Sequence, residues 1–128
     1  MIKIKKITIA PQKEDGFRIM VESECPEKID FKDAKVDLWL KEIAPSLECY
    51  ECLKEDPPAF NKFKEKYREK LRGKKTLIKI IRDLENKNKT VTLLYCFEDD
   101  EKNCAAVLKE KLEGYKVIKG SVGRIHGG

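Results

Sequence analysis

The uncharged stretch from Val91 to Phe97, VTLLYCF, constrains the fold of this chain more than any other feature. It is rich in β-branched and aromatic residues, and a run of this kind predicts a strand that is buried on both faces. Four acidic residues follow at positions 98–101, so the chain must leave the sheet and reach the surface there. Apolar residues then recur at helical spacing from about Asn103, which predicts that a helix begins at that point.

The order of a buried strand, a short polar loop and a helix N-terminus predicts where a functional site would lie. In open α/β sheets, free backbone N–H groups and the helix dipole converge at this position, and ligands bind there. We therefore expect a functional site at residues 98–104, although their sequence does not identify a reaction.

Length and composition indicate one globular domain. The chain has 128 residues, of which 40% are charged and 41% hydrophobic, and this is enough apolar sequence to bury a core. No window approaches the roughly 18 consecutive apolar residues of a membrane span, so we expect a soluble protein that is not exported.

The cysteines argue against a framework of disulfide bonds. They are odd in number, and one falls inside the predicted buried strand; they are Cys25, Cys49, Cys52, Cys96 and Cys104. Because disulfide frameworks are typical of exported proteins, we expect reduced thiols and a cytoplasmic location.

Two further strands are predicted before the first helix. Residues 2–9 alternate imperfectly between apolar and charged side chains, and residues 17–21 alternate more regularly. The connection between them is too short for the helical crossover that parallel neighbours need. The two strands are therefore either antiparallel partners or not adjacent in the sheet.

The middle of the chain is predicted to be helical. Apolar residues at i, i+3, i+4 and i+7 predict a helix over 36–43, which Pro45 ends. Three more helices are predicted to follow, with starts at Ser46, at Asp56 with Pro57, and at Thr76.

We therefore predict a single compact α/β domain over residues 1–118 and a mobile tail over 119–128. The small sheet is mixed or mainly parallel, strand 91–97 is central, residues 115–118 add an edge strand, and helices pack on the sheet in two or three layers. The expected core consists of Trp39, Leu40, Ile43, Phe60, Phe63, Tyr67, Ile80, Ile81, Leu84, Leu93 and Leu94.

Several segments together resemble one family. They are GFRIMV at 16–21, KDAKVDLWLKEIAPS at 32–46, and VTLLY at 91–95 followed by Asn103 and Ala105. In this order they resemble the YeaO-like branch of domain-of-unknown-function family 488, with a match from about Ile2 to Leu112. The resemblance implies a compact α/β domain and no established activity.

The sequence departs from the family's pattern at positions where that pattern carries charge. After the second strand, the family's sequence pattern resembles an Asp-Arg pair followed by Trp-Pro-Arg. This chain instead has Glu22 and Ser23, and then Cys, Pro and Glu at 25–27. The Arg usual in the next short helix is Tyr50, and the His usual after Asn is Cys104. An anion pocket built from the family's arginines is therefore not expected here. The positions that remain in place are Arg18, Asp37, Trp39, Lys41, Glu42, Ser46, Asp56, Asp99 and Asn103.

Two cysteines are candidates for a catalytic role. Cys104 lies near a predicted helix N-terminus, where the dipole would lower the pKa of its thiol. Cys25, in the loop after the second strand, is the other candidate. For both, a small packing residue is the favoured alternative, since the one histidine of the chain is His126 in the tail and a Cys-His pair is not available.

Asn103, Asp99, Arg18 and Ser23 are the candidate ligand-binding residues. For Asn103 the simpler interpretation is a helix cap. The carboxylates at 98–101, with those of Glu22 and Glu24, are oxygen ligands of the kind that Mg²⁺ or Ca²⁺ prefers. A solvated acidic loop without a metal is the favoured interpretation. The lone CxxC at 49–52 lacks the second pair of a zinc site and is interpreted as a helix face. We therefore predict no metal and no cofactor.

The predicted helices over 57–89 are strongly basic. Between Asn61 and Lys89 there are twelve basic and four acidic residues. Phosphates are attracted to such a surface, but no aromatic side chain is left exposed by the pattern to stack on bases, so nucleic acid is possible but not favoured.

Two classes of function therefore remain open. The first is a site for a small polar ligand, enzymatic or not, at the carboxyl ends of strands 17–21 and 91–97. The second is a non-enzymatic binding module that uses the basic helices over 57–89 to bind protein or nucleic acid. We favour the first. The sequence does not decide whether the chain is an enzyme, and it leaves the oligomeric state open.

Overall fold

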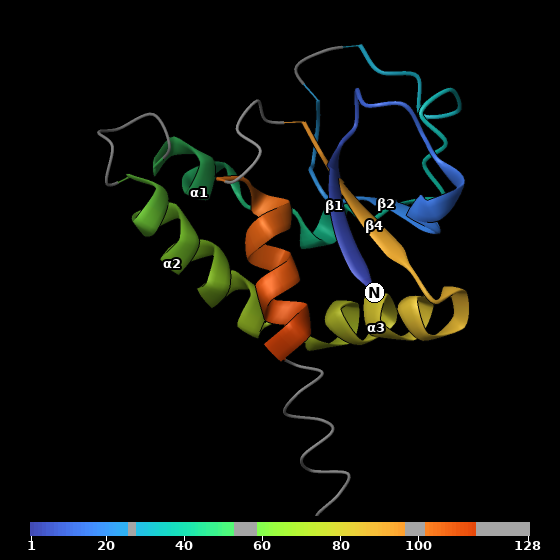
Figure 1. Ribbon diagram of the computed structural model, residues 1–128. Helices are drawn as coiled ribbons and strands as arrows, with labels where there is room; N and C mark the ends of the chain where they lie inside the picture. Colours follow the sequence, from blue (N-terminus) through green and yellow to red (C-terminus); the bar gives the residue numbers. More distant parts are fainter. Residues whose placement is uncertain (26–27, 53–58, 97–101, 115–128) are drawn as a thin grey trace, which may run out of the picture.

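The computed structural model describes residues 1–25, 28–52, 59–96 and 102–114 (Figure 1). The strands are β1 (Ile2–Lys6), β2 (Phe17–Met20), β3 (Leu38–Trp39) and β4 (Val91–Tyr95). The helices are α1 (Leu47–Cys52), α2 (Ala59–Arg72) and α3 (Lys75–Asn88), and a further helix spans residues 104–114. Two short 3-10 turns, η1 (Lys13–Asp15) and η2 (Lys41–Ile43), complete the described elements.

The four strands form one parallel sheet in the order β1-β4-β2-β3. Leu93 of β4 is opposite Ile4 of β1 on one side and Ile19 of β2 on the other. Every residue of β4 is buried, so the prediction of a central buried strand is confirmed. β4 separates β1 from β2, which confirms the second of the two alternatives for these strands.

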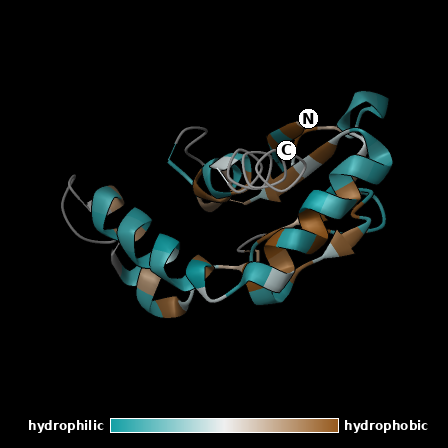
Figure 2. Cartoon of the chain, turned by 90° about the horizontal axis from the view of Figure 1, so that it is seen from below, coloured by the Kyte–Doolittle hydropathy of each residue, from teal (hydrophilic) through white to brown (hydrophobic). Residues whose placement is uncertain are grey.

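The main hydrophobic core lies on one face of the sheet, where the helices pack. Hydrophobic residues follow one side of α3 (Figure 2). Side chains from α2, α3 and helix 104–114 join alternate strand residues in one cluster, which includes Ile19, Val91, Leu93, Ile43, Phe63, Tyr67, Leu71, Ile78, Ile81, Leu108 and Leu112. The α/β architecture with helices packed on the sheet is therefore as predicted.

A second, smaller cluster covers the opposite face. Met20 and Leu94 of the sheet pack there with Ile7 and Ala34, and half-buried residues of the connection between β2 and β3 pack against them. We call this connection the β2–β3 loop; its described residues are 21–25 and 28–37. One face of the sheet is therefore covered by helices and the other by a loop.

The predicted helix over 36–43 is wrong. The chain there forms strand β3 and the 3-10 turn η2. β2 offers a free edge, and the backbone N–H groups of Asp37 and Leu40 donate to the carbonyls of Arg18 and Met20, each at 2.9 Å. Short apolar runs fit a strand or a helix equally well, and here the edge of the sheet decided between them.

Most of the predicted core is buried, but two residues are not. Trp39 is 40% exposed because β3 lies at the edge of the sheet, and Ile80 is 38% exposed on the outer side of α3. Phe60 and Leu84 are half-buried against the main core. The remaining predicted core residues are buried.

Two predicted helix starts are confirmed by capping contacts. The hydroxyl of Ser46 accepts a hydrogen bond from the Cys49 N–H at 3.3 Å before α1. The side-chain oxygen of Asn103 accepts one from the Ala106 N–H at 2.9 Å. The predicted start at Asp56 and Pro57 and the predicted edge strand at 115–118 lie outside the described residues. Among those described, no helix combines the length and the apolar composition needed to cross a membrane.

Gly16 allows the chain to enter β2 beside β4. Its φ is 64°, a conformation that side chains disfavour, and a Cβ added there would lie 2.2 Å from the Thr90 carbonyl oxygen. That oxygen also accepts the Phe17 N–H at 3.0 Å, so it cannot move without breaking the start of the β2–β4 ladder.

Gly16→Ala should therefore lower the free energy of unfolding by about 3 kcal/mol, measured by urea denaturation. Gly73→Ala is the matched control, because the nearest atom to an added Cβ there is the Lys70 carbonyl oxygen at an ordinary 3.6 Å. The control should change stability by less than about 1 kcal/mol. Equal effects of the two substitutions would contradict the assigned conformation of Gly16.

Candidate functional site

The carboxyl ends of β2 and β4 meet at a buried polar cluster centred on Glu22. This residue is 3% exposed, and its carboxylate accepts hydrogen bonds from the Tyr50 hydroxyl at 2.6 Å and from the Cys96 N–H. Its backbone carbonyl accepts the Trp39 indole N–H at 2.7 Å. Glu22 thus joins the chain just after β2 to α1, to β3 and to the residue that follows β4.

Cys104, the principal catalytic candidate, belongs to this cluster but is not activated. The residue is fully buried in the first turn of helix 104–114. Burial raises the pKa of its thiol well above the ordinary value; the nearby Glu22 carboxylate raises it further and outweighs a hydrogen bond from Tyr50. The expected lowering of this pKa by the helix dipole is therefore wrong, because loss of solvent is the larger effect.

Tyr50 keeps its proton for the same reason. Burial raises the pKa of its phenol, and the Glu22 carboxylate, which accepts the hydrogen bond of this hydroxyl, raises it further. A tyrosine or a cysteine must lose its proton to act as a nucleophile or a base. Neither Tyr50 nor Cys104 is therefore prepared to act as a nucleophile or a base.

Cys25, the second catalytic candidate, is bonded to Cys96 in a disulfide, with their Cα atoms 5.8 Å apart. The prediction that all cysteines are reduced is thus wrong for this pair. An odd number of cysteines permits one bond, and Cys96 lies just beyond the last residue of β4 rather than inside the strand. Both residues are half-buried: Cys96 directly follows β4, and Cys25 lies in the β2–β3 loop, five residues beyond the end of β2. Cys49 and Cys104 are free and buried.

The structure describes three of the four predicted ligand-binding residues. Asn103 is fully buried beside Cys104 and caps its helix. Ser23 is half-buried directly after Glu22. Asp99 lies outside the described residues. Arg18 is the exception, because its side chain lies on the opposite face of the sheet from the main core.

Arg18 is buried in an ion pair rather than open to a ligand. Its guanidinium lies 2.5 Å from the Asp15 carboxylate and donates to the backbone carbonyls of Ala34 and Lys35. Lys5 also pairs with Asp15, at 3.0 Å. These contacts join η1, β1, β2 and the β2–β3 loop, so Arg18 holds the loop on the sheet.

The pKa of Asp15 is lowered by this arrangement. Burial alone would raise it, but the hydrogen bond from the Gln12 N–H and the charges of Lys5 and Arg18 lower it by more. The carboxylate therefore stabilises the fold at pH values above its ordinary pKa of 3.8, and this contribution is lost as the pH falls through the lowered pKa of the folded state.

Asp15→Asn should lower the free energy of unfolding by about 3 kcal/mol at neutral pH, because it leaves the buried charge of Arg18 unpaired. The difference from the wild type should shrink below about pH 4, where the wild type begins to lose the same charge. Urea denaturation at a series of pH values measures both quantities. A difference that persists unchanged at low pH would contradict the role of the Asp15 carboxylate.

Metal binding finds no support in the part of the chain that the structure describes. No three His, Cys, Asp or Glu side chains there are placed to hold an ion. The predicted acidic run at 98–101 lies outside this part. Of the CxxC pair, Cys49 is buried on α1 and accepts the Ser46 hydroxyl at 3.3 Å, as expected for a helix face.

The cluster contains three of the positions at which the sequence departs from the charged pattern it otherwise resembles. Glu22, Tyr50 and Cys104 stand in place of Asp, Arg and His. The structure brings all three together, although 28 residues separate the first two. Sequence reasoning named these departures one by one but did not predict that they touch. At two of these positions, Tyr50 and Cys104, a basic side chain of the pattern is absent, and this was the available signal.

Comparison with known proteins identifies the family. Residues 1–117 match the model of a family described as the inactive DUF488-N3 subclade. The chain belongs to this family.

Relatives of this DUF488-N3 chain are themselves uncharacterised. It is 31% identical over 111 residues to the uncharacterised protein YeaO of Escherichia coli strain K12, which covers 87% of this chain and 96% of YeaO. It is 32% identical over 101 residues to the uncharacterised proteins Mb3100c of Mycobacterium bovis and Rv3073c of Mycobacterium tuberculosis, with 79% of this chain and 84% of each relative covered. No solved structure gives a significant match.

Because the Cys104 thiol is buried and protonated, it should react very slowly with iodoacetamide in the folded protein. Its rate should remain low from pH 7 to pH 9, because burial keeps the pKa of the thiol above its ordinary value of 9.0. Mass spectrometry of the labelled peptide measures the rate, and the same peptide from urea-unfolded protein is the control. Rapid labelling of folded Cys104 at neutral pH would restore the nucleophile hypothesis.

Proposed function

We propose that this chain is a non-catalytic binding protein that recognises an acidic segment of a partner protein. The observation that carries the proposal is a groove of about 660 Å³ between the α2–α3 junction and helix 104–114. Its lining residues are Arg68, Leu71, Arg72, Lys75, Ile78, Glu110, Lys111 and Gly114. The protonated Cys104 and the description of the family as inactive support a role without catalysis.

The groove carries a surplus of positive charge. The carboxylate of Glu110 is already paired with Arg68 at 3.0 Å and Lys64 at 3.3 Å, and these contacts lower its pKa against the opposing effect of burial. Within the described part of the chain, Arg72, Lys75 and Lys111 have no carboxylate partner. Three cations from three helices therefore remain to attract an anionic group.

The shape of the groove favours a protein segment over nucleic acid. A volume of this size holds a few side chains, whereas a phosphate backbone follows a continuous basic surface. Bases also need exposed aromatic side chains to stack on, but Phe63 and Tyr67 of α2 are fully buried in the core. Leu71 and Ile78 lie at the base of the groove, where an apolar side chain of an acidic segment would pack.

Charge neutralisation in the groove tests the proposal. The variant Arg72→Gln/Lys75→Gln/Lys111→Gln should bind a short fluorescein-labelled peptide of Glu, Asp and Leu at least about tenfold more weakly, since each lost ion pair contributes roughly 0.5–1 kcal/mol. Fluorescence anisotropy at constant salt measures the affinity. Labelled single-stranded and duplex oligonucleotides are tested in parallel.

The matched control, Lys13→Gln/Lys32→Gln/Lys87→Gln, removes the same net charge from exposed positions that do not line the groove. It should change the affinity by less than about twofold. Equal weakening by the two variants would show that binding reflects net charge alone. Tighter binding of an oligonucleotide than of the peptide would overturn the choice of a protein partner.

A small polar ligand at the carboxyl ends of β2 and β4 is the second candidate. It is supported by two buried polar residues near these strand ends, Glu22 and Asn103. Rapid reaction of Cys104 in the folded protein would favour this candidate over the groove. For either function we propose the cytoplasm as the compartment, in keeping with the free thiols of Cys49 and Cys104.

A further inference from the structure

We propose that Glu110 determines which class of partner the basic groove accepts, by excluding nucleic acid from it. The inference rests on the proposed function, because it concerns the same groove between the α2–α3 junction and helix 104–114. Among the described residues that line this groove, Glu110 alone is acidic. One oxygen of its carboxylate lies 3.0 Å from the Arg68 guanidinium and 3.3 Å from the Lys64 ammonium, and both of these cations belong to α2.

The two partners of Glu110 belong to a row of basic side chains along α2. Lys64, Arg68 and Arg72 follow one another at intervals of four residues, so they lie on one side of the helix. With a rise of 1.5 Å per residue, the row is about 12 Å long. Lys75, at the start of α3, lines the groove together with Arg72 and continues the row past the junction. Without an acid, such a row is a continuous basic surface of the kind that a phosphate backbone follows.

Glu110 interrupts this row. Its carboxylate offsets the charges of Lys64 and Arg68, so the surplus of positive charge is confined to the end of the row that lies beside Lys111. Burial raises the pKa of Glu110, but hydrogen bonds from Arg68 and Lys64 lower it by more, and the residue is therefore ionised at neutral pH. The side chains of Glu110 and Arg68 are 54% and 46% exposed, and ion pairs this exposed contribute little to the stability of a fold.

A carboxylate at this position affects the two classes of partner differently. A nucleic acid carries a negative charge at every nucleotide, so a strand that follows the row brings a phosphate close to Glu110, and like charges repel. A short acidic segment needs only the cations beside Lys111, and it can place an apolar side chain against Leu71 and Ile78. Specificity commonly depends on repelling the wrong partner as well as on attracting the right one.

The variant Glu110→Gln tests the inference in the full-length protein, with a fluorescein-labelled DNA duplex and the labelled acidic peptide as probes. Because two cations are freed, the affinity for the duplex should rise about tenfold. The slope of log affinity against log salt concentration should steepen by about two, since each neutralised phosphate adds roughly 0.9. The affinity for the peptide should change by less than about threefold. Fluorescence anisotropy at a series of salt concentrations measures these quantities, and circular dichroism confirms that the variant is folded.

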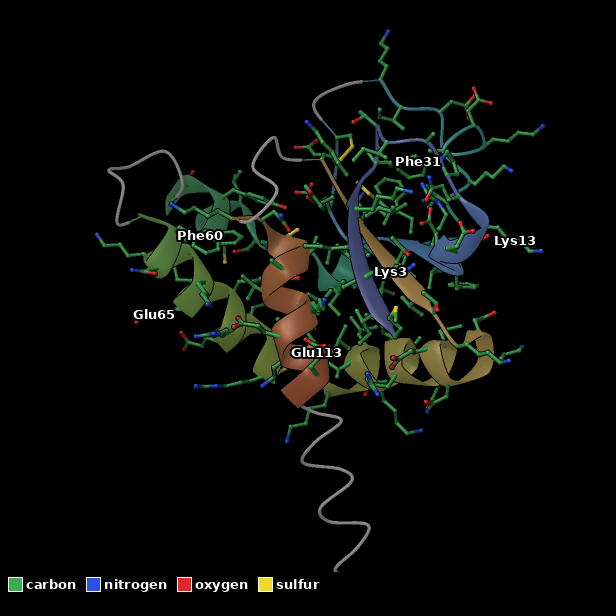
Figure 3. The ribbon with its side chains drawn as sticks, in the orientation of Figure 1. Lys3, Lys13, Phe31, Phe60, Glu65 and Glu113 are labelled. Atoms are coloured by element: carbon green, nitrogen blue, oxygen red, sulfur yellow. A yellow bond between two sulfur atoms is a disulfide. The ribbon has the colours of Figure 1, made fainter. Side chains whose placement is uncertain are left out.

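Glu113→Gln is the matched control, because it removes the same charge from the same helix. Glu113 lies near the end of helix 104–114 (Figure 3), is exposed, and has no ion pair within the part of the chain that the structure describes. This control should change the affinity for the duplex by less than about twofold and leave the salt slope as in the wild type. Adding Lys64→Gln and Arg68→Gln to Glu110→Gln removes the freed cations and should return the duplex affinity to about the wild-type value.

An unchanged duplex affinity and salt slope in Glu110→Gln would overturn the inference, while peptide binding by the wild type would leave the proposed function standing. Equal tightening by Glu110→Gln and Glu113→Gln would also overturn it, because net charge would then explain the effect. So would an equal rise in the affinities for duplex and peptide, since Glu110 would then weaken both classes alike. Tightening of the duplex by Glu110→Gln alone supports the inference, and if the wild type then fails to bind the peptide, only the choice of an acidic protein segment is wrong.

Discussion

The burial of β4 on both faces is the constraint on which the rest of the structure depends. β4 hydrogen-bonds to β1 on one side and β2 on the other, and its five residues are all buried. Its alternate side chains enter two different clusters, since Leu93 belongs to the large one and Leu94 to the small one. Such a strand is stable only when both of its faces are covered by other parts of the chain. Here helices cover one face and the β2–β3 loop covers the other.

On the helical face the cover is a large hydrophobic core, and on the other face a smaller hydrophobic cluster is joined by an ion pair and a disulfide. Arg18 and Asp15 form a buried ion pair that fixes the second half of the β2–β3 loop, and the bond from Cys25 to Cys96 fixes the first half. Glu22 stands between the two systems, because it contacts Tyr50 of α1, Trp39 of β3 and the backbone just after β4. Glu22 therefore links the start of the loop to the end of β4, to β3 and to α1.

The errors of sequence reasoning have a common origin in local pattern. The spacing over 36–43 matched a helix, but the free edge of β2 offered hydrogen bonds that a helix would leave unused. The position of Cys104 suggested an activated thiol, but burial beside Glu22 has the larger effect on its pKa. In both cases the interaction that decided the outcome was made with a residue distant in sequence. A reading of the local sequence pattern does not include that residue. Arg18 was misjudged for a different reason: its partner Asp15 is only three residues away, but the local sequence does not show that both side chains are buried.

The sequence by itself determined the central strand, the capped helices at Ser46 and Asn103, most of the large core and membership of an α/β family. These follow from the periodicity of burial along one element and from capping contacts within a single turn, both of which are local. Only the tertiary structure decided the strand order, the bond across 71 residues, the meeting of Glu22 with Tyr50 and Cys104, and the basic groove. Each of these joins separate elements, and their juxtaposition is set by how the elements pack around β4 rather than by the residues within any one of them.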